Sequence, residues 1–412
     1  MKVVVVGAGV VGRCTALALR REGADVTVLD KATRDHGASI ANAGWLTPVL
    51  SAPMSGPGVV PDVVKATLRG DRYVGGRPVA GLVGWTARFL RSCRAASHLD
   101  GLRVTFEFAA RAVEQFRELK DSGVEFEMHE RGLILAACTE HGLGHAVGMV
   151  NAAREAGYEH ETQVLDAASA RRLEPALGDG VVGAVYAPAE AHVRPESVQA
   201  GLRAALLAEG VELREGVDVH GVERDAPGWR VATGAGPVAA DRVVIAAGAA
   251  SAPLLRGLGV RVPLLSGKGY SITAKGTGTT PTHPVKLLEA TLASTPFDDG
   301  LRMSGKFELG ARTEKVHEGA IRLIRKGAAR YFRDWQPVEP QLRLAGLRPS
   351  TPDSLPIIGP VPGSDGMFVA TGHGTLGLTL APATAAALAP LVLHDKSAPE
   401  LARFTVERFG TR

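Results

Sequence analysis

The chain has 412 residues and a formal charge of +4, with 45% hydrophobic and 22% charged residues. This length exceeds one ordinary hydrophobic core and predicts roughly two to three domain-sized units. The composition is that of a globular enzyme rather than of a fibrous or disordered protein. Basic and acidic residues are interspersed without blocks of like charge, so a nucleic-acid partner is not expected.

Cysteine and histidine use argues against disulfide and metal chemistry. The three cysteines, Cys14, Cys93 and Cys138, are odd in number and far apart, which fits neither a disulfide framework nor a zinc cluster and suits a reducing compartment. The 12 histidines are dispersed, and no metal site is predicted.

Two apolar stretches bear on localisation. Val3–Val6 is too short for the apolar core of a signal peptide. Leu376–Leu393 includes threonines and prolines and falls short of the ~20 apolar residues that a membrane span needs, so a buried helix is expected there. The chain is therefore expected to be cytoplasmic, with peripheral association at the inner face of the membrane left open.

The opening stretch KVVVVGAGVVG predicts a strand that runs into a phosphate-binding turn. Val3–Val6 is a β-branched run typical of a strand buried on both faces of a parallel sheet. Gly7, Gly9 and Gly12 follow at G-x-G-x-x-G spacing. This spacing suits, in turn, a tight turn, close approach of the backbone to a pyrophosphate, and packing of the next helix on the strand.

A helix is predicted over 10–22, and the strand that follows it ends in Asp30. The helix directs its N-terminal amides and the positive end of its dipole at phosphates, and a carboxylate at position 30 accepts hydrogen bonds from ribose hydroxyls. These elements in this order predict a dinucleotide cofactor. Asp30 disfavours the 2′-phosphate of NADP, but the motif does not separate NAD from FAD.

Three later stretches favour FAD. In GASIANAGWLTP, over 37–48, small and polar residues allow close passage past a pyrophosphate and a flavin. The stretch DRVVIAAGAAS, over 241–251, is a buried strand that ends in small residues. The stretch over 367–393 combines a strand, a glycine loop and an apolar helix, and so predicts a second helix N-terminus near the negative charge of a reduced flavin.

These stretches, together with LEPAL, PLLSGKGYSIT, GLRPSTPDSLPIIG and GHGTLGLTLAP, resemble the D-amino-acid oxidase-like superfamily of FAD-dependent oxidoreductases, and within it the bacterial D-amino acid dehydrogenase small subunits. The resemblance implies FAD held without a covalent tether, since no cysteine lies near either flavin-facing loop. The cofactor-binding residues implied by the motifs and the resemblance are Gly7, Gly9, Val10, Val11, Gly12, Asp30, Lys31, Ser39, Asn42, Ala43, Gly44, Ala247, Gly248, Gly372, Gly374, Thr375, Leu376 and Gly377.

We expect an α/β protein in which a Rossmann-like FAD-binding domain is interleaved with an α+β substrate domain built on an antiparallel sheet. The FAD-binding domain is expected to use 1–55, 186–262 and 340–412, and the substrate domain 56–185 and 263–339. Within these ranges, 52–61 reads as a linker or flap, and 74–94 departs from the family pattern.

Arg348, in GLRPSTPDSLPIIG, is the predicted clamp for a substrate carboxylate, because a guanidinium offers a planar, always charged, bidentate donor. The alternative is a structural pairing with Asp353. Tyr270 and His373 complete the expected catalytic set, as a hydroxyl donor or pocket wall and as a loop residue facing flavin or substrate. His192, Arg194 and Lys268 are further candidates for the substrate pocket, and Glu308 is a candidate strand-face residue near it.

The function expected from the resemblance is FAD-dependent oxidative deamination of small amino acids, with the D configuration favoured. Hydride transfer from Cα to flavin N5 would give an imine that hydrolyses to a 2-oxo acid and ammonia. Alternatives are oxidation of a secondary or cyclic amine acid such as sarcosine, glycine, D-proline or hydroxy-D-proline, an NAD-dependent dehydrogenase, or a flavin-binding subunit without turnover. The electron acceptor would be oxygen or a quinone, and no side-chain base is required.

Overall fold

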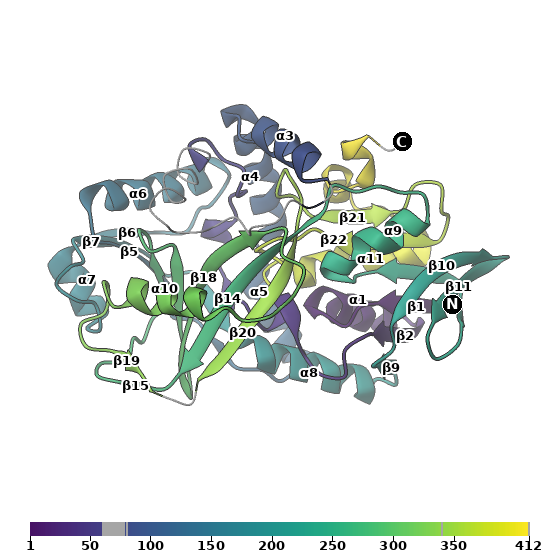
Figure 1. Ribbon diagram of the computed structural model, residues 1–412, viewed down its shortest axis with the longest axis horizontal. Helices are drawn as coiled ribbons and strands as arrows, with labels where there is room; N and C mark the ends of the chain where they lie inside the picture. Colours follow the sequence, from purple (N-terminus) through teal and green to yellow (C-terminus); the bar gives the residue numbers. More distant parts are fainter. Residues whose placement is uncertain (60–78, 80, 339–340, 411–412) are drawn as a thin grey trace.

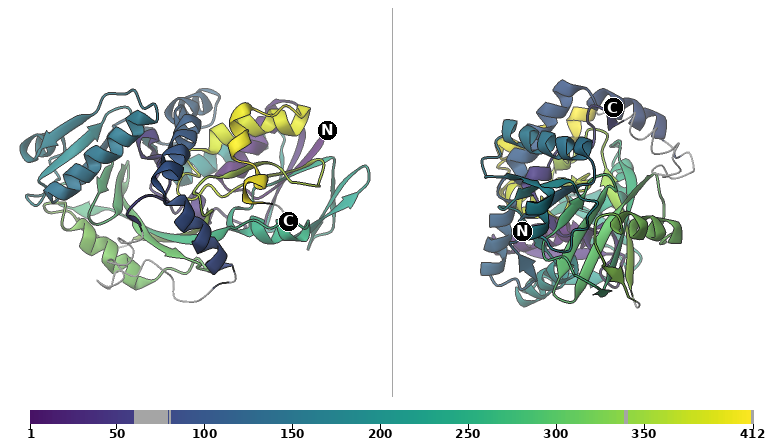
Figure 2. Two further views of the ribbon diagram at one scale, coloured as in Figure 1. Left: turned by 90° about the horizontal axis from the view of Figure 1, so that it is seen from above. Right: turned by 90° about the vertical axis from the view of Figure 1, so that its left-hand side faces the viewer.

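The computed structural model describes residues 1–59, 79, 81–338 and 341–410. Parts of the expected flap over 52–61 and of the 74–94 segment therefore lie outside the described residues. Two large sheets organise the described chain, one in each half of the elongated molecule (Figure 1). The N-terminal and C-terminal segments, purple and yellow, meet in the same half (Figure 2).

The first sheet has six strands, in the order β21-β22-β13-β1-β2-β9. All neighbours pair in parallel except β21 and β22. Its strands are β1 (Lys2–Val6), β2 (Asp25–Asp30), β9 (Glu212–Glu215), β13 (Arg242–Ile245), β21 (Ile357–Pro360) and β22 (Met367–Thr371).

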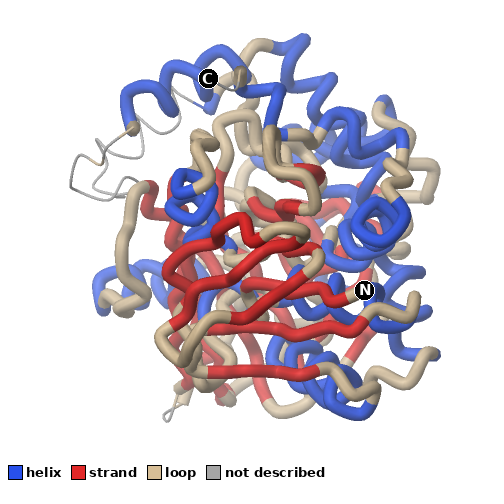
Figure 3. Tube along the Cα trace, turned by 90° about the vertical axis from the view of Figure 1, so that its right-hand side faces the viewer, coloured by secondary structure: helices blue, strands red, loops and turns tan. Residues whose placement is uncertain are grey.

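The valine run explains how this sheet comes to be covered on both sides. Val3 and Val5 face a core shared with helices α1 (Val10–Arg21), α8 (Pro195–Ala208) and α11 (Ala381–His394). Val4 and Val6 face a second core, because successive side chains of a strand point to opposite faces. That second core is closed by α9 (Ser251–Gly257) and by the antiparallel strands β10 (Val219–Asp225), β11 (Gly228–Thr233) and β12 (Val238–Ala240). Figure 3 views this half end-on, with strands in red and helices in blue around them.

The second sheet has eight strands, in the order β20-β14-β18-β17-β16-β5-β7-β6, and only β16 and β5 pair in parallel. Its strands are β5 (Leu133–Ala137), β6 (Gln163–Asp166), β7 (Gly183–Ala187), β14 (Leu265–Ala274), β16 (Val285–Leu287), β17 (Leu292–Phe297), β18 (Gly300–Leu309) and β20 (Leu342–Ser350). Helix α10 (Glu318–Ala328) packs on one face, which we call the back face.

The opposite face, which we call the front face, is covered at its β5–β7 end by α6 (Glu140–Glu155). At its β14–β20 end it lies against the chain around η1 (Gly37–Ser39), which belongs to the nucleotide-binding half. The remaining elements are η2 (Pro48–Leu50), α3 (Leu82–Ser92), α4 (Ala95–Ala109), α5 (Ala112–Asp121), α7 (Ala167–Leu173), η3 (Gly248–Ala250), η4 (Pro399–Arg403), η5 (Val406–Phe409) and the short strands β3 (Trp45–Leu46), β4 (Met128–His129), β8 (Ala191–Val193), β15 (Gly276–Thr277) and β19 (Gln336–Pro337).

Strand pairing and helix packing favour different domain limits at three places. The limit at 186 falls inside β7, and the limit at 340 separates β20 from β14, its partner in the eight-stranded sheet. In addition, α5 packs on α11, so Phe116 belongs to the core of the nucleotide-binding half rather than to the substrate domain. We propose that 342–350 belongs to the substrate domain and that 104–126 belongs to the nucleotide-binding domain. Among the described helices, none has the length and apolar character to cross a membrane.

Candidate functional site

The glycine turn after β1 has the backbone geometry that a phosphate-binding turn needs. Gly7 has φ +112°, and a Cβ on it would come 2.5 Å from the carbonyl oxygen of Ala246. A Cβ on Gly12 would come 1.9 Å from the carbonyl oxygen of Gly7, so only glycine lets α1 pack this closely on β1. A Cβ on Gly9 would come 3.0 Å from the Ser39 hydroxyl oxygen. Gly9 therefore borders the loop over 37–44 rather than the core.

Asp30 closes the same turn from the end of β2. Its carboxylate accepts a hydrogen bond of 2.6 Å from the backbone N–H of Ala8 and one of 2.8 Å from that of Ala32. A small cleft lined by Gly9, Asp30, His36 and other residues lies beside it. The acid thus stands next to the glycine turn, where the ribose of a dinucleotide is expected, and the neighbouring Lys31 is exposed.

The loop over 37–44 is held by its own side chains. The Ser39 hydroxyl accepts from the backbone N–H of Val10 at 3.0 Å, at the start of α1. The Asn42 amide donates to the carbonyls of Ala38 and Ser39 and accepts from the N–H of Gly44 at 2.8 Å. The Asn42 side chain therefore shapes the loop, and any contact of this residue with a cofactor would come from its backbone.

Arg302, which sequence analysis missed, ties that loop to the eight-stranded sheet. This arginine on β18 is fully buried. It donates to Thr273 at 2.8 Å, to the carbonyls of Ile40 and Asn42 at 3.0 and 3.2 Å, and pairs with Glu196. A buried arginine persists when its charge is paired and its donors are satisfied. Its isolated position in GLRMSG carried no motif that would have identified it.

The C-terminal glycine loop joins the two sheets. The N–H of Gly374 donates to the carbonyl of Pro349 at 2.9 Å, and the Thr371 hydroxyl donates to the carbonyl of Gly248 at 2.8 Å. The loop residues Gly372, Gly374, Thr375, Leu376 and Gly377 therefore lie between η3 and the end of β20. Helix α11 begins at Ala381, so the buried helix expected over 376–393 is present but starts five residues later.

Arg348 lies on the front face of β20. It pairs in register with Gly267 on β14, and a Cβ on the next glycine, Gly269, would come 2.5 Å from the Arg348 Cζ. A Cβ on Gly346 would come 2.6 Å from the backbone N of Ala38, so the front face approaches the nucleotide-binding loop closely here. The glycines at alternate positions of β14 and β20 thus make room for the guanidinium and for the loop.

Arg348 is deep, and its charge has no counter-ion among the described side chains. Burial lowers the pKa of its guanidinium to about 10, while part of the residue stays accessible. Among the residues that the structure describes, no carboxylate pairs with it. The alternative partner, Asp353, is taken by Arg408, whose Nε lies 2.8 Å from Oδ2 of that carboxylate. The structure therefore does not show the alternative, a structural pairing of Arg348 with Asp353.

Lys286 on β16 is a second cation on the front face. It pairs with Ala293 on β17 and Leu135 on β5, and Ala293 in turn pairs with Ser304 on β18. Burial lowers the pKa of its ammonium group, and the positive charge of Arg348 lowers it further. The positive charge of Arg348 therefore reaches Lys286 across the front face. Lys286 was not among the residues predicted from sequence, although a lone lysine within PVKLL is unusual in a buried strand.

Comparison with known proteins decides what this site belongs to. Residues 2–391 match the family described as FAD dependent oxidoreductase, abbreviated DAO. The chain belongs to this family. A D-amino acid dehydrogenase of Paramagnetospirillum magneticum is 32% identical over 99% of both chains, and one of Methylobacterium nodulans is 33% identical over 98% of this chain and 97% of its own.

A solved structure of glycine oxidase from Geobacillus kaustophilus is similar to this fold, with a TM-score of 0.78, 25% identity and coverage of 98% of both chains. Family membership confirms the prediction of an FAD-dependent oxidoreductase and sets aside the NAD-dependent alternative. The residues present fit FAD: a glycine turn with no room for side chains at Gly7 and Gly12, an acid at the end of β2, and a loop over 37–44 pinned beside α1.

Two of the predicted site residues lie on the wrong face of the sheet. Tyr270 and Lys268 alternate with Gly267 and Gly269 on β14, and they point to the back face, where α10 packs. The Tyr270 hydroxyl donates to Glu308 at 2.6 Å, and the Lys268 ammonium lies 3.7 Å from the same carboxylate. These three side chains satisfy one another within the back-face core and do not share a space with Arg348.

The predicted histidines and Arg194 are also taken up by structural contacts. The His373 imidazole is buried against the Thr384 hydroxyl of α11 at 3.0 Å, and burial lowers its pKa to about 3. His192 is fully buried and donates to the carbonyl of Pro296 at 2.9 Å. Arg194, at the start of α8, has its guanidinium 2.5 Å from the Asp299 carboxylate. A neutral, enclosed imidazole and a paired guanidinium do not favour the roles expected of them.

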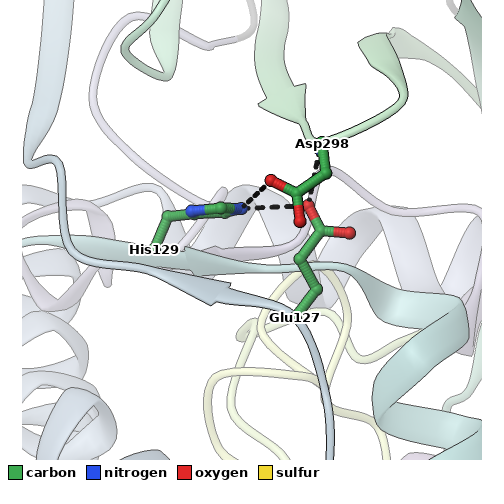
Figure 4. A group of neighbouring side chains, drawn as sticks. All are labelled: Glu127, His129 and Asp298. Carbon is green, nitrogen blue, oxygen red and sulfur yellow. Dashed lines mark hydrogen bonds and ion pairs between the residues drawn. The ribbon is translucent and has the colours of Figure 1, made fainter.

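One group of described residues has the composition of a metal site. Donor atoms of Glu127, His129 and Asp298 lie within 4.8 Å of one another (Figure 4). They already bond to each other: His129 Nε2 is 3.0 Å from Glu127, whose carboxylate also accepts from the backbone N–H of Asp298. The Arg194 guanidinium lies 3.6 Å from the Glu127 carboxylate. Hydrogen bonds and ion pairs within this group therefore join β4 to the turn after β17.

Proposed function

We propose that this protein oxidises the Cα–N bond of a small amino acid, with the D configuration favoured, to an imine that hydrolyses to a 2-oxo acid and ammonia. The observation that carries the proposal is Arg348, a deep guanidinium without a described counter-ion on the face of the substrate sheet that meets the nucleotide-binding loop. The relatives named D-amino acid dehydrogenase support the substrate class and its configuration.

The residues of the front face would act mainly by positioning. Bound FAD supplies the two-electron acceptor. Arg348 holds the substrate carboxylate by two parallel hydrogen bonds, which fixes the orientation of the Cα–H bond. The positive charge of Arg348 also favours the uncharged form of a substrate amine over its ammonium form, because like charges disfavour each other. The amine lone pair is then released by loss of a proton to solvent, with no side-chain base.

We propose that FAD is held without a covalent bond, by the glycine turn, Asp30, the loop over 37–44, Ala247, Gly248 and the loop over 372–377. Three contacts in particular are assigned to backbone groups: those of Val10, Val11 and Ala43. Burial raises the pKa of the Cys14 thiol to about 12 and raises the pKa of Cys93 and Cys138, which keeps all three as thiols. Tethering would need a thiolate. Release of intact FAD by acid precipitation tests this point.

A second candidate is oxidation of glycine or of a secondary amine acid such as sarcosine or a cyclic imino acid. The likeness to a glycine oxidase structure favours keeping it. Both candidates use the same carboxylate clamp and differ in the walls of the pocket. For the electron acceptor we propose oxygen or a quinone. Val83 and Leu90 on α3 are exposed apolar residues at which contact with a membrane surface, and hence with a quinone, can be tested by vesicle flotation.

The function is tested with a substrate panel on the FAD-loaded protein. D-amino acids, their L enantiomers, glycine, sarcosine and D-proline are added anaerobically, and flavin absorbance is followed. We expect bleaching by D-amino acids, with the 2-oxo acid formed in equal amount. Bleaching by glycine or sarcosine alone would favour the second candidate. If no member of the panel bleaches the flavin, the proposed oxidation is wrong and a flavin-binding subunit without turnover is favoured instead.

A further inference from the structure

On the front face of the eight-stranded sheet, the two serines Ser271 and Ser304 lie in register with Lys286. We call this set of aligned residues the row. Strand register joins Ser271 on β14, Ser304 on β18, Ala293 on β17 and Lys286 on β16, so these four side chains point to the same side. Arg348 shares this side, because Leu344, four residues before it on the same strand, pairs with Ser271. The row therefore leads from the strands beside Arg348 to the ammonium group of Lys286.

The serine hydroxyls of this row have polar capacity that the described protein does not use. Ser271 and Ser304 are buried, with exposures of 0% and 3%, and neither hydroxyl has a hydrogen-bond partner among the described residues. Buried polar atoms are normally satisfied, so two orphaned hydroxyls on neighbouring strands indicate groups that a ligand or water completes. Lys286 is only partly accessible, and burial lowers the pKa of its ammonium group.

Charge balance is the second observation. Lys286 and Arg348 are close enough for the charge of one to lower the pKa of the other, and no carboxylate in the described part of the chain pairs with either. On the back face, by contrast, the buried Lys268 has Glu308 at 3.7 Å. A single substrate carboxylate on Arg348 would leave Lys286 without a partner. Two deep cations on one face match a ligand with two anionic groups.

We propose that Lys286 binds a second carboxylate of the substrate and that this enzyme prefers acidic amino acids, with a side chain of the aspartate or glutamate type, over neutral ones of equal size. This inference rests on the proposed function, because Arg348 holds the first carboxylate. Ser271 and Ser304 supply hydroxyls along the row between the two cations. Lys286 is thus a specificity-determining residue that takes no part in the transfer of electrons.

The test compares isosteric pairs that differ in one charge, D-aspartate with D-asparagine and D-glutamate with D-glutamine, with D-alanine as a reference. For the wild-type holoenzyme we expect kcat/KM to favour an acid over its amide. In Lys286→Met the preference should fall by about 30-fold or more, the lower end of the effect of removing one partner of a buried charge pair. Activity on D-alanine should change little. Lys286→Arg should retain the preference, and Lys326→Met, which removes an exposed positive charge on α10, is the matched control.

A binding measurement gives a second readout that does not depend on turnover. Succinate and propionate are titrated into the holoenzyme while the flavin spectrum is followed. Succinate should bind more tightly than propionate in the wild type, and Lys286→Met should remove the difference. Equal binding of the two in the wild type, or an equal loss on acidic and neutral substrates in Lys286→Met, would overturn the inference. If no amino acid bleaches the flavin at all, it is the proposed function that fails.

Discussion

The guanidinium of Arg348 lies against the backbone of Gly269 on the neighbouring strand, where a Cβ would stand 2.5 Å from Cζ. This contact joins a glycine at an ordinary strand position to the residue that we propose binds the substrate carboxylate. A methyl group at position 269 would meet only the guanidinium of Arg348, which can move because it is the far end of a flexible side chain. A substitution at position 269 should therefore affect substrate binding by Arg348 without affecting the stability of the fold.

Gly269→Ala should displace Arg348 while leaving the protein folded. We expect kcat/KM to fall by about tenfold or more, since a misplacement of about 1 Å in a positioning group lowers rates steeply. The melting temperature should change by only a few degrees. Gly148→Ala, on α6, has no atom within 4 Å of the added carbon and is the control. Wild-type kinetics in Gly269→Ala would show that the substrate does not use this arginine.

Arg348→Lys should retain FAD and lose most turnover. Lysine keeps the charge but replaces a planar, bidentate donor with a point charge, so the substrate carboxylate is no longer oriented. We expect kcat/KM to fall by about 100-fold, within the range for truncated buried charge pairs. Flavin content per protein, read from absorbance, should match the wild type. A variant with normal kcat/KM would reject the clamp.

Tyr270→Phe distinguishes the back face from the front face. The hydroxyl of Tyr270 bonds to Glu308 at 2.6 Å in the core beneath α10. Its removal should lower the free energy of unfolding by about 1 kcal/mol, because a partly buried carboxylate loses one hydrogen-bond donor. The kcat/KM should stay within about twofold of the wild type. A loss comparable to that of Arg348→Lys would place this hydroxyl in the site instead.

Gly9 and Gly12 should respond differently to the same substitution. Gly9→Val should yield folded apoprotein, since the side chain would lie in the path of the pyrophosphate beside Ser39. Gly12→Val should fail to fold, because even its Cβ would lie 1.9 Å from the backbone oxygen of Gly7. Circular dichroism reports folding and absorbance reports flavin content. Full flavin content in Gly9→Val would contradict the assigned phosphate contact.

Glu190 should make stability depend on pH. It is 1% exposed and accepts from the Tyr158 hydroxyl at 2.7 Å, and burial raises the pKa of its carboxyl to about 8 from an ordinary 4.5. The folded state therefore holds a proton that the unfolded state releases above pH 4.5. The stabilisation is complete below that pH and is lost as pH rises toward 8, by about 1.4 kcal/mol per pH unit.

Glu190→Gln keeps the acceptor for Tyr158 and removes the titration. Chemical unfolding at pH 5.5 and pH 8 should show a smaller loss of stability with rising pH in the variant than in the wild type. The comparison cancels the other titrating groups, which both proteins share. Identical slopes in the two proteins would mean that Glu190 is ionised in the folded state at neutral pH.

Local pattern was sufficient for the nucleotide-binding half. The β-branched run, the glycine spacing and the acid at position 30 act on residues close together in the chain, and the strands and helix they predict are present as β1, α1 and β2. The family and its cofactor followed from motifs of the same local kind.

The substrate face was decided only by tertiary structure. Tyr270 and its neighbour Gly269 point to opposite faces of β14. Which of them shares a face with Arg348 depends on the register of β14 with β20 and on the face that α10 covers, and the local sequence does not determine either. Asp353 finds Arg408, 55 residues away, in place of Arg348. Lys286 joins Arg348 only because five strands from distant parts of the chain pair in register. Side-chain direction alternates with every residue, so a shift of one position exchanges the two faces completely.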